Sequence, residues 1–247
     1  MTGAGTHTPP RRTLEQSLDW VAEGSELLLA SVESLADRRL EGPSGLPGWS
    51  RTHVIAHVCG NAEALARLAE WAASGIPTPM YGSSDKRAAD IAAGAALAPE
   101  ALRSWAVSSA QALARKLAEL TPTAWQSVVT ATPGRTLPAT DIPWIRAREV
   151  LVHAVDLGTG LGFRDLPRDF LIALLDDVVA KRSAGADGPA LSLAISDVGE
   201  HRLILGTGEM RRVSAGLAPM VGWLTGRSAG RVRMASGAPA PALPPWM

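Results

Sequence analysis

The chain has 247 residues, of which 46% are hydrophobic, and its 24 Lys and Arg residues balance its 24 Asp and Glu residues, so the formal net charge is zero. This composition suffices for a buried core and gives no general attraction to nucleic acid. Because Cys59 is the single cysteine, an intramolecular disulfide is excluded.

Neither a targeting segment nor a membrane span is recognisable in the sequence. Residues 1–12 lack the apolar stretch of a secretory signal, and no apolar run approaches the roughly 20 residues that a membrane-spanning helix needs. We therefore expect a soluble, cytoplasmic protein with neither nucleic-acid nor membrane partners, and a flexible tail over residues 1–12.

Most of the chain shows the apolar spacing of helices, in which side chains three and four residues apart share a face. Thr13 is a candidate N-cap of the first helix, with Gln16 completing a capping box, and Gly75 is a candidate C-terminal stop of the second. Helices are predicted over residues 14–39, 51–74, 85–96, 99–120, 141–158 and 167–182.

Strand-like segments lie mainly towards the C-terminus. The stretch QSVVTATPGRTLP (126–138) is rich in β-branched residues and broken by Pro-Gly, which predicts extended chain or a small hairpin. After residue 163, short strand-like runs alternate with Gly-rich turns, with a short helix predicted over APMVGWL (218–224). We predict an α+β chain in which a helical bundle over residues 13–163 precedes a small α+β domain over residues 164–247.

Two pairs of residues have the spacing of ligands on a helix face. His53 and His57 are four residues apart, as are Glu149 and His153. A catalytic zinc commonly has three N or O ligands and an open position, which His57, Glu149 and His153 could supply. Such spacing also arises by chance, and Glu149 could pair with a nearby arginine at the surface. Its segment, REVLVHAVDL, is otherwise apolar, so its polar side chains are expected to be buried and to need partners.

Four segments resemble one known family in the same order along the chain. LPGWSRTHVIAHVCGNAEAL (46–65) and WIRAREVLVHAVDLG (144–158) resemble signatures of the mycothiol-dependent maleylpyruvate isomerase family, and WLTGR and LPPW resemble its C-terminal domain. The resemblance implies a DinB-like four-helix bundle with a small C-terminal domain, and a monomer. It also implies that His57, Glu149 and His153 bind the metal and that Arg227 takes part in catalysis.

Other residues near these motifs have two interpretations each. Asn61, one turn after His57, either lines the pocket and contacts the cofactor or makes a hydrogen bond in the bundle core. Asp156 either orients His153 or is a polar residue near a helix end. Cys59 lies on nearly the opposite helix face from His57 and is expected to be a buried, inert thiol.

The remaining candidates are mostly arginines. Arg146 and Arg148 could bind substrate carboxylates, although such residues are more often solvated. Arg227 could contact the cofactor and the reacting substrate, or could be a surface residue at a helix C-terminus. His53 is expected to be a first-turn residue or a support for the ligands.

The resemblance implies an enzyme that uses zinc, or another divalent metal, and the small-molecule thiol mycothiol on a small electrophilic substrate. Metal coordination stabilises a thiolate, which is a strong nucleophile. Addition to the cis double bond of maleylpyruvate, rotation and elimination would give fumarylpyruvate. Three alternatives stay open: a mycothiol-dependent S-transferase, a non-catalytic zinc-binding sensor, and an inactive helical scaffold, although the intact ligand set argues against the last.

Overall fold

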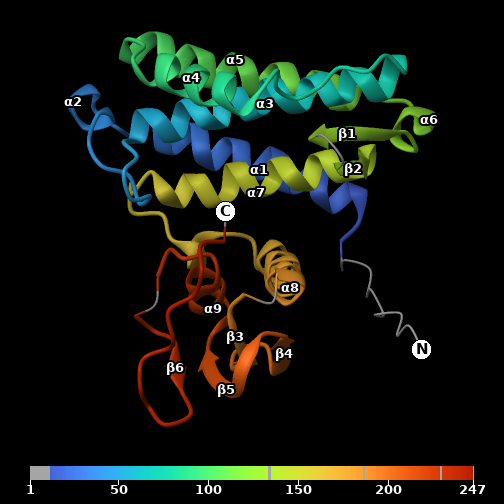
Figure 1. Cartoon of the computed structure of the whole chain (residues 1–247). Helices are drawn as coiled ribbons and strands as arrows, with labels where there is room; N and C mark the ends of the chain where they lie inside the picture. The colour runs from blue at the N-terminus through green and yellow to red at the C-terminus, as the bar shows by residue number, and fades with distance from the viewer. Residues whose placement is uncertain (1–11, 133–134, 186, 229, 247) are drawn as a thin grey trace. The chain divides into compact units, whose positions relative to one another are not determined.

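The computed structural model describes residues 12–132, 135–185, 187–228 and 230–246 (Figure 1). The chain divides into one compact unit, Leu14–Leu161, and a second that contains Gly162–Met247. The domain boundary predicted after residue 163 lies near this division. Apart from residue 12, the predicted flexible tail lies outside the described residues.

Four long helices of the first unit form a bundle. In Figure 1 they lie side by side, and α1 and α3 each contact both α5 and α7. A further helix packs on α3 and is the one that matters most for the site. These helices are α1 (Leu14–Glu33), α3 (Arg51–Ser74), α5 (Pro99–Ala118), α7 (Ile142–Asp156) and the additional α4 (Ser84–Ala95).

Shorter elements join the helices of the bundle. Strands β1 and β2 pair antiparallel, which confirms the extended structure predicted over residues 126–138. The short elements are α2 (Asp37–Leu40), α6 (Pro122–Trp125), β1 (Val128–Thr132), β2 (Arg135–Pro138) and the 3-10 turn η1 (Ala139–Asp141).

Close packing between α1 and α7 positions the helix that carries two of the candidate ligands. A Cβ atom on Gly24 would lie 2.5 Å from Val150 Cγ2 and 2.7 Å from Leu151 Cγ, so the two backbones can approach only because this residue is glycine. Trp20 and Trp144 meet edge to face with ring centroids 5.9 Å apart. These contacts hold α7 against the bundle core.

The bounds of α3 agree with the prediction for residues 51–74. Ser50 is the N-cap and its hydroxyl accepts a hydrogen bond from the His53 backbone N–H. Gly75 adopts a left-handed conformation with φ of 75°, which ends the helix. The other helices predicted after residue 50 also agree with the structure to within about three residues.

The prediction of one continuous helix over residues 14–39 is wrong. The helix ends at Glu33, and Ala36 is extended before α2 begins. Leu35 and Leu40 are both buried, with 1% of each residue exposed. Five positions apart on one helix, they would point about 140° from one another. The break allows both side chains to be buried.

The second unit combines two helices with a mixed sheet. Strand order is β4-β3-β5-β6, with β3 and β5 parallel and the outer pairs antiparallel. Helix α8 packs against α9 and β4. The elements are η2 (Phe163–Asp165), α8 (Arg168–Gly185), β3 (Pro189–Ile195), β4 (Glu200–Ile204), β5 (Thr207–Ala215), α9 (Leu217–Leu224) and β6 (Arg233–Met234).

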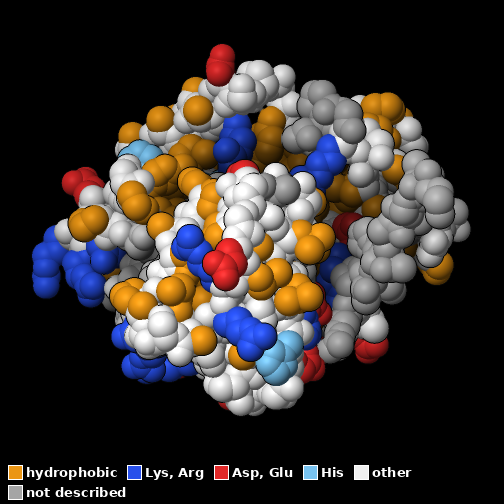
Figure 2. Space-filling model, turned by 60° about the horizontal axis from the view of Figure 1, so that its bottom comes forward, with side chains coloured by type: hydrophobic (Ala, Val, Ile, Leu, Met, Phe, Trp, Pro, Cys, Tyr) orange, Lys and Arg blue, Asp and Glu red, His pale blue; other side chains and the backbone are white. Residues whose placement is uncertain are grey.

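The predicted fold class, a helical bundle followed by a small α+β region, is confirmed. Within the described residues, no helix has both the length and the apolar character needed to cross a bilayer. Figure 2 shows basic and acidic side chains distributed among apolar and neutral ones on one face of the molecule, as expected from the balanced net charge.

Candidate metal centre

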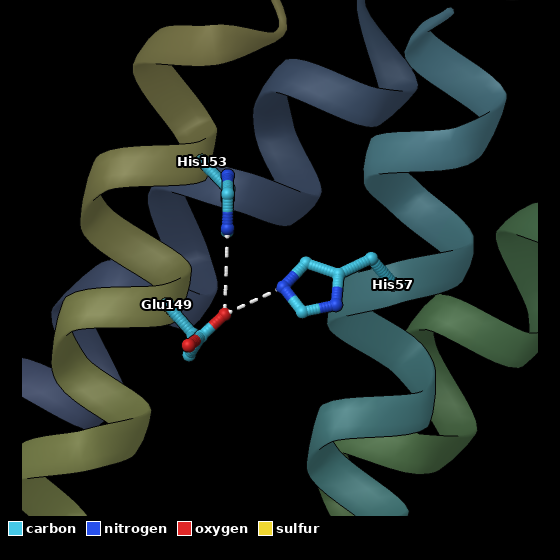
Figure 3. A group of neighbouring side chains, drawn as sticks. All are labelled: His57, Glu149 and His153. Atoms are coloured by element: carbon cyan, nitrogen blue, oxygen red, sulfur yellow. Dashed lines mark hydrogen bonds and ion pairs between the residues drawn. The ribbon is translucent and has the colours of Figure 1, made fainter. Parts of the chain in front are cut away.

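The three predicted metal ligands meet between α3 and α7 (Figure 3). His57 Nε2 lies 2.8 Å from Glu149 Oε2, and His153 Nε2 lies 3.4 Å from the same oxygen. One candidate ligand atom from each residue lies within 4.8 Å of the other two. The spacing of four residues puts Glu149 and His153 on one face of α7, and the contact of α7 with α3 brings His57 opposite them.

Asp156 holds the imidazole of His153 in position. The Nδ1–H of His153 donates to Asp156 Oδ2 at 2.8 Å, and only 1% of Asp156 is exposed. The backbone oxygen of Asp156 also accepts a hydrogen bond from the Gly45 N–H. Because Nδ1 is held by Asp156, Nε2 is the ring atom that faces Glu149, and it can bind a metal once it has lost its proton. Of the two interpretations of Asp156, the structure supports the one in which it orients a ligand.

Burial and mutual contacts shift the pKa values of all three residues. Burial lowers the pKa of His57, and this effect exceeds the opposing influence of Glu149. Burial also disfavours the charged forms of Glu149 and His153. Hydrogen bonds to both imidazoles nevertheless hold the pKa of Glu149 well below its usual range. Hydrogen bonds to Asp156 and Glu149 likewise raise the pKa of His153 to about 9. At neutral pH the cluster thus holds a carboxylate, a neutral imidazole and a charged one.

The donor set fits a divalent metal ion. Two imidazole nitrogens and a carboxylate oxygen are a common ligand set for zinc, with bonds of about 2.0–2.2 Å that separate tetrahedral ligand atoms by about 3.4 Å. The distance between His153 Nε2 and Glu149 Oε2, 3.4 Å, already has this value, whereas His57 Nε2, at 2.8 Å, would have to move slightly away. A fourth position would be left for water or a ligand.

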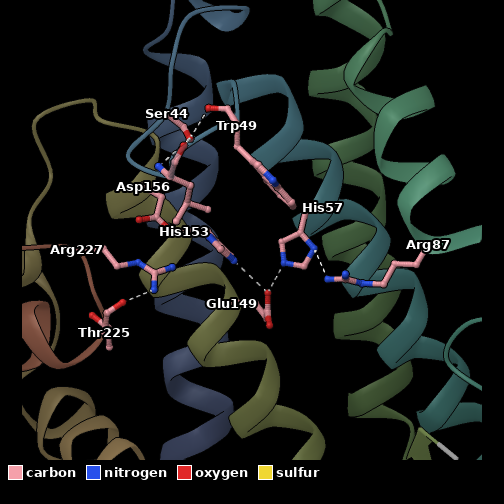
Figure 4. Close-up of polar contacts among 10 residues, drawn as sticks. Ser44, Trp49, His57, Arg87, Glu149, His153, Asp156, Thr225 and Arg227 are labelled. Carbon is pink, nitrogen blue, oxygen red and sulfur yellow. Dashed lines mark hydrogen bonds and ion pairs between the residues drawn. The ribbon is translucent and has the colours of Figure 1, made fainter. Parts of the chain in front are cut away.

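The other side of His57 contacts an arginine and a tryptophan (Figure 4). The Nη2 group of Arg87, on α4, lies 3.2 Å from His57 Nδ1. The ring of Trp49 meets that of His57 edge to face, with centroids 5.7 Å apart. The imidazole of His57 thus connects the candidate metal centre to α4.

A cavity of about 770 Å³ adjoins His57 on this side. It is bounded by α3, α4, the segment between them and Trp105 of α5. Its volume lies within the range of small-molecule sites, about 300–1,000 Å³. Its lining combines apolar side chains with the cations Arg67, Lys86 and Arg87.

Arg87 was not identified from the sequence, although a signal was present. Arg87, Ile91 and Gly94 recur at positions i, i+4 and i+7 and so share one face of α4. Ile91 is buried, and a Cβ atom on Gly94 would lie 2.9 Å from the Cβ of Ala56. This close approach presses the face against α3 and directs Arg87 towards His57.

Arg146 and Asn61 form a second buried polar cluster. Arg146 is 1% exposed, so the expectation that it is solvated is wrong. Its Nη1 group donates to Val58 O at 2.7 Å and to Asn61 Oδ1 at 3.1 Å, and burial lowers its pKa to about 10. Asn61 therefore makes the hydrogen bond in the bundle core, while its contact with a cofactor stays a prediction.

The remaining candidates of the bundle have structural contacts. Cys59 is buried as predicted, and burial raises the pKa of its thiol to about 12, which disfavours the reactive thiolate. His53 occupies the first turn of α3, where its Nδ1 lies 2.6 Å from Ser50 Oγ. The Arg148 guanidinium lies 5.6 Å from the Trp144 ring centroid.

Arg227 belongs to the second unit and follows α9. Its Nη1 group donates to Thr225 O at 2.7 Å (Figure 4), and its guanidinium lies 5.7 Å from the centroid of the Trp246 ring. Gly226 precedes it with φ of 78°, a conformation that favours glycine. The predicted roles of Arg227 in catalysis and in cofactor binding stay predictions.

Fold and site together define a class of protein: a helical bundle with a candidate centre for one metal ion, followed by a small α+β unit. Comparison with known proteins identifies the family within that class. Residues 10–158 match the family described as the mycothiol maleylpyruvate isomerase N-terminal domain, and the chain belongs to this family. The resemblance recognised in the sequence is therefore confirmed.

Two solved structures are similar over nearly the full length of the chain. The crystal structure of the mycothiol-dependent maleylpyruvate isomerase has 34% sequence identity and a TM-score of 0.91. That of a mutant of the isomerase has 33% identity and a TM-score of 0.90. Each alignment covers 95% of this chain and 98% of the other. No curated protein matches the chain.

Proposed function

We propose that the protein is a zinc-dependent enzyme that uses mycothiol to isomerise maleylpyruvate to fumarylpyruvate. The observation that carries the proposal is the convergence of His57, Glu149 and His153 in a chain that is 34% identical to a mycothiol-dependent maleylpyruvate isomerase. This ligand set suits zinc and also accommodates other first-row metals. The partners are a small-molecule thiol and a small electrophile.

The residues of the site have distinct tasks in this reaction. Zinc bound to the three ligands would supply a Lewis acid that stabilises a thiolate at neutral pH. Asp156 keeps the Nε2 atom of His153 directed at the centre, and the charge of Glu149 offsets part of the metal's charge. Arg227 is proposed to hold a carboxylate or the developing enolate of the substrate, and Asn61 and Arg227 to contact the thiol cofactor.

Cis–trans isomerisation requires the double bond to become a single bond temporarily. Reversible addition of the thiol sulfur to one alkene carbon moves the π electrons towards the substrate carbonyl. Rotation about the resulting single bond, followed by loss of the same thiolate, restores the double bond in the trans form. The thiol is regenerated, so no oxidant or reductant is consumed.

The volume of the cavity beside His57 is also compatible with a second candidate, a mycothiol-dependent S-transferase. About 770 Å³ is more than a small dicarboxylate alone would fill, and it leaves room for a bulkier electrophile. In that reaction the sulfur stays bonded to the product and one thiol is consumed per turnover. Product analysis distinguishes the two, because the isomerase returns free mycothiol and the transferase does not.

Metal analysis combined with an activity assay tests the proposal. We expect about one zinc per chain in the wild type, and reduced zinc in His57→Ala, Glu149→Ala and His153→Ala. His53→Ala is the matched control on α3 and should retain zinc. Zinc-loaded wild type should convert maleylpyruvate only when mycothiol is added. Wild type that takes up no zinc, or zinc-loaded protein inactive with mycothiol towards every electrophile offered, would contradict the proposal.

A further inference from the structure

Arg87 is a cation of the cavity beside His57 with no carboxylate among its described contacts. The described contacts of the Arg87 guanidinium are with the His57 ring, at 3.2 Å, and with Tyr81, whose ring centroid lies 5.5 Å away. The carboxylates of the same wall have other partners. Glu63 accepts a hydrogen bond from the Trp105 indole at 2.6 Å, and Asp90 pairs with Lys86 at 2.9 Å.

The contact between Arg87 and His57 depends on which ring nitrogen carries the proton. Since a guanidinium can only donate, His57 Nδ1 must be the acceptor, and the ring proton must lie on Nε2, facing Glu149. A nitrogen that ligates a metal has no proton, so the proton of a neutral imidazole then lies on the other nitrogen. With a metal on Nε2, the Nδ1 of His57 becomes a donor that cannot accept from Arg87.

Metal loading would therefore leave two donors, the His57 Nδ1–H and the Arg87 guanidinium, facing the same cavity. An anion satisfies both, and a carboxylate can accept two parallel hydrogen bonds from a guanidinium. Apolar side chains of Met80, Ile91 and Trp105 line the same cavity and suit a carbon skeleton. Arg67 stabilises the wall by donating twice to Met80 O, at 3.0 and 2.5 Å.

We propose that this cavity binds the carboxylate of a small organic anion, that Arg87 is its anchoring residue, and that metal loading strengthens the binding by releasing Arg87 from His57. The inference rests on the proposed function in two respects, because it takes the centre to bind a metal and the carboxylate to be that of the substrate. By linkage, the anion should in turn strengthen metal binding by the same factor.

Calorimetric titration with maleate, a small cis-dicarboxylate, tests the inference. Zinc-loaded wild type, Arg87→Gln and Lys86→Gln are compared, with the zinc content of each checked by elemental analysis. Lys86→Gln is the matched control because Lys86 lines the same cavity but pairs with Asp90. We expect the Kd for maleate to rise about tenfold or more in Arg87→Gln and less than about twofold in the control. Metal-free wild type should bind maleate several-fold more weakly than zinc-loaded wild type.

Four results would overturn the inference. The first is that zinc-loaded wild type does not bind maleate, and the second is that Arg87→Gln binds it as tightly as wild type does, as expected if the metal alone holds maleate. The third is that Arg87→Gln and Lys86→Gln lose maleate affinity equally, and the fourth is that Arg87→Gln loses its zinc. A separate assay of isomerisation with mycothiol distinguishes failure of the proposed subsite from failure of the proposed function. If the protein isomerises maleylpyruvate but its maleate affinity does not depend on Arg87, the proposed subsite is contradicted and the proposed function is not. Maleate binding that depends on Arg87, in protein inactive with mycothiol, supports the subsite and contradicts the function.

Discussion

Two buried polar clusters connect α3 and α7, and they differ in what they offer a ligand. In one, the guanidinium of Arg146 donates to the backbone of Val58 and the side chain of Asn61, so donors meet acceptors within the protein. In the other, His57 and His153 direct ring nitrogens at a single oxygen of Glu149. Burial of polar groups is common to both, but only the second brings together atoms that can all bind a cation.

The difference separates a structural cluster from one that we propose to be functional. A buried donor with a buried acceptor is satisfied and stabilises the fold. Converging nitrogens and oxygens need protons or a metal between them, and they shift one another's pKa values, as at His153 and Glu149. Changes to the first cluster should therefore alter stability, and changes to the second should alter metal binding.

The largest effect is expected on removal of the buried guanidinium. Arg146→Met should lower the free energy of unfolding by about 3 kcal/mol, because Val58 O and Asn61 lose a charged donor inside the core. Urea denaturation of the metal-free protein measures this. Arg115→Met, at an exposed position of α5, is the control and should change stability by less than about 0.5 kcal/mol. Equal effects of the two substitutions would mean that Arg146 is not a structural link.

The orienting carboxylate should matter for the metal. Asp156→Asn weakens the hydrogen bond that holds the His153 ring, so zinc affinity should fall about 10- to 100-fold. Competition with a chromophoric chelator measures the affinity. Asp19→Asn, on the exposed face of α1, should leave it unchanged. Unaltered affinity in Asp156→Asn would show that packing alone orients the imidazole.

Asn61→Ala distinguishes the two interpretations of Asn61, a hydrogen bond with Arg146 in the bundle core and a contact with the cofactor. Loss of one acceptor for Arg146 should lower the free energy of unfolding by about 1.5 kcal/mol while zinc content stays unchanged. Urea denaturation and elemental analysis are the measurements. Unchanged stability together with weaker mycothiol binding would instead support the predicted cofactor contact.

Zinc affinity should depend on pH through His153. Its pKa of about 9 in the metal-free protein means that a proton must leave before Nε2 can bind zinc. From neutral pH up to this pKa, affinity should therefore rise about tenfold per pH unit, and it should level off above it. His57, with its lowered pKa, and the ionised Glu149 add little to this dependence. Calorimetry at neutral pH in buffers of different ionisation enthalpy should detect release of about one proton; release of none would contradict the assigned charge state.

Much of the fold and of the candidate ligand set could be predicted from the sequence because they depend on local patterns. Gly75 ends α3 as predicted, and Ser50 caps its start, since capping and left-handed backbone are local properties. Glu149 and His153 could be paired from their spacing on an apolar helix. The assignment of His57 as the third ligand came from the resemblance to a known family.

The tertiary structure alone decided the features that depend on contacts between distant segments. Arg146 and Asn61, 85 residues apart, become a core pair because α7 packs on α3, and the spacing of Arg146 along its own helix does not reveal which residue it contacts. Arg87 reaches His57, 30 residues away, because Gly94 lets α4 approach α3 closely. The sequence by itself determined most of the helices, though not the break after Glu33, and the residues able to bind a metal. Packing decided which polar side chains satisfy one another and which are left facing a ligand, because that depends on how helices distant in the chain approach.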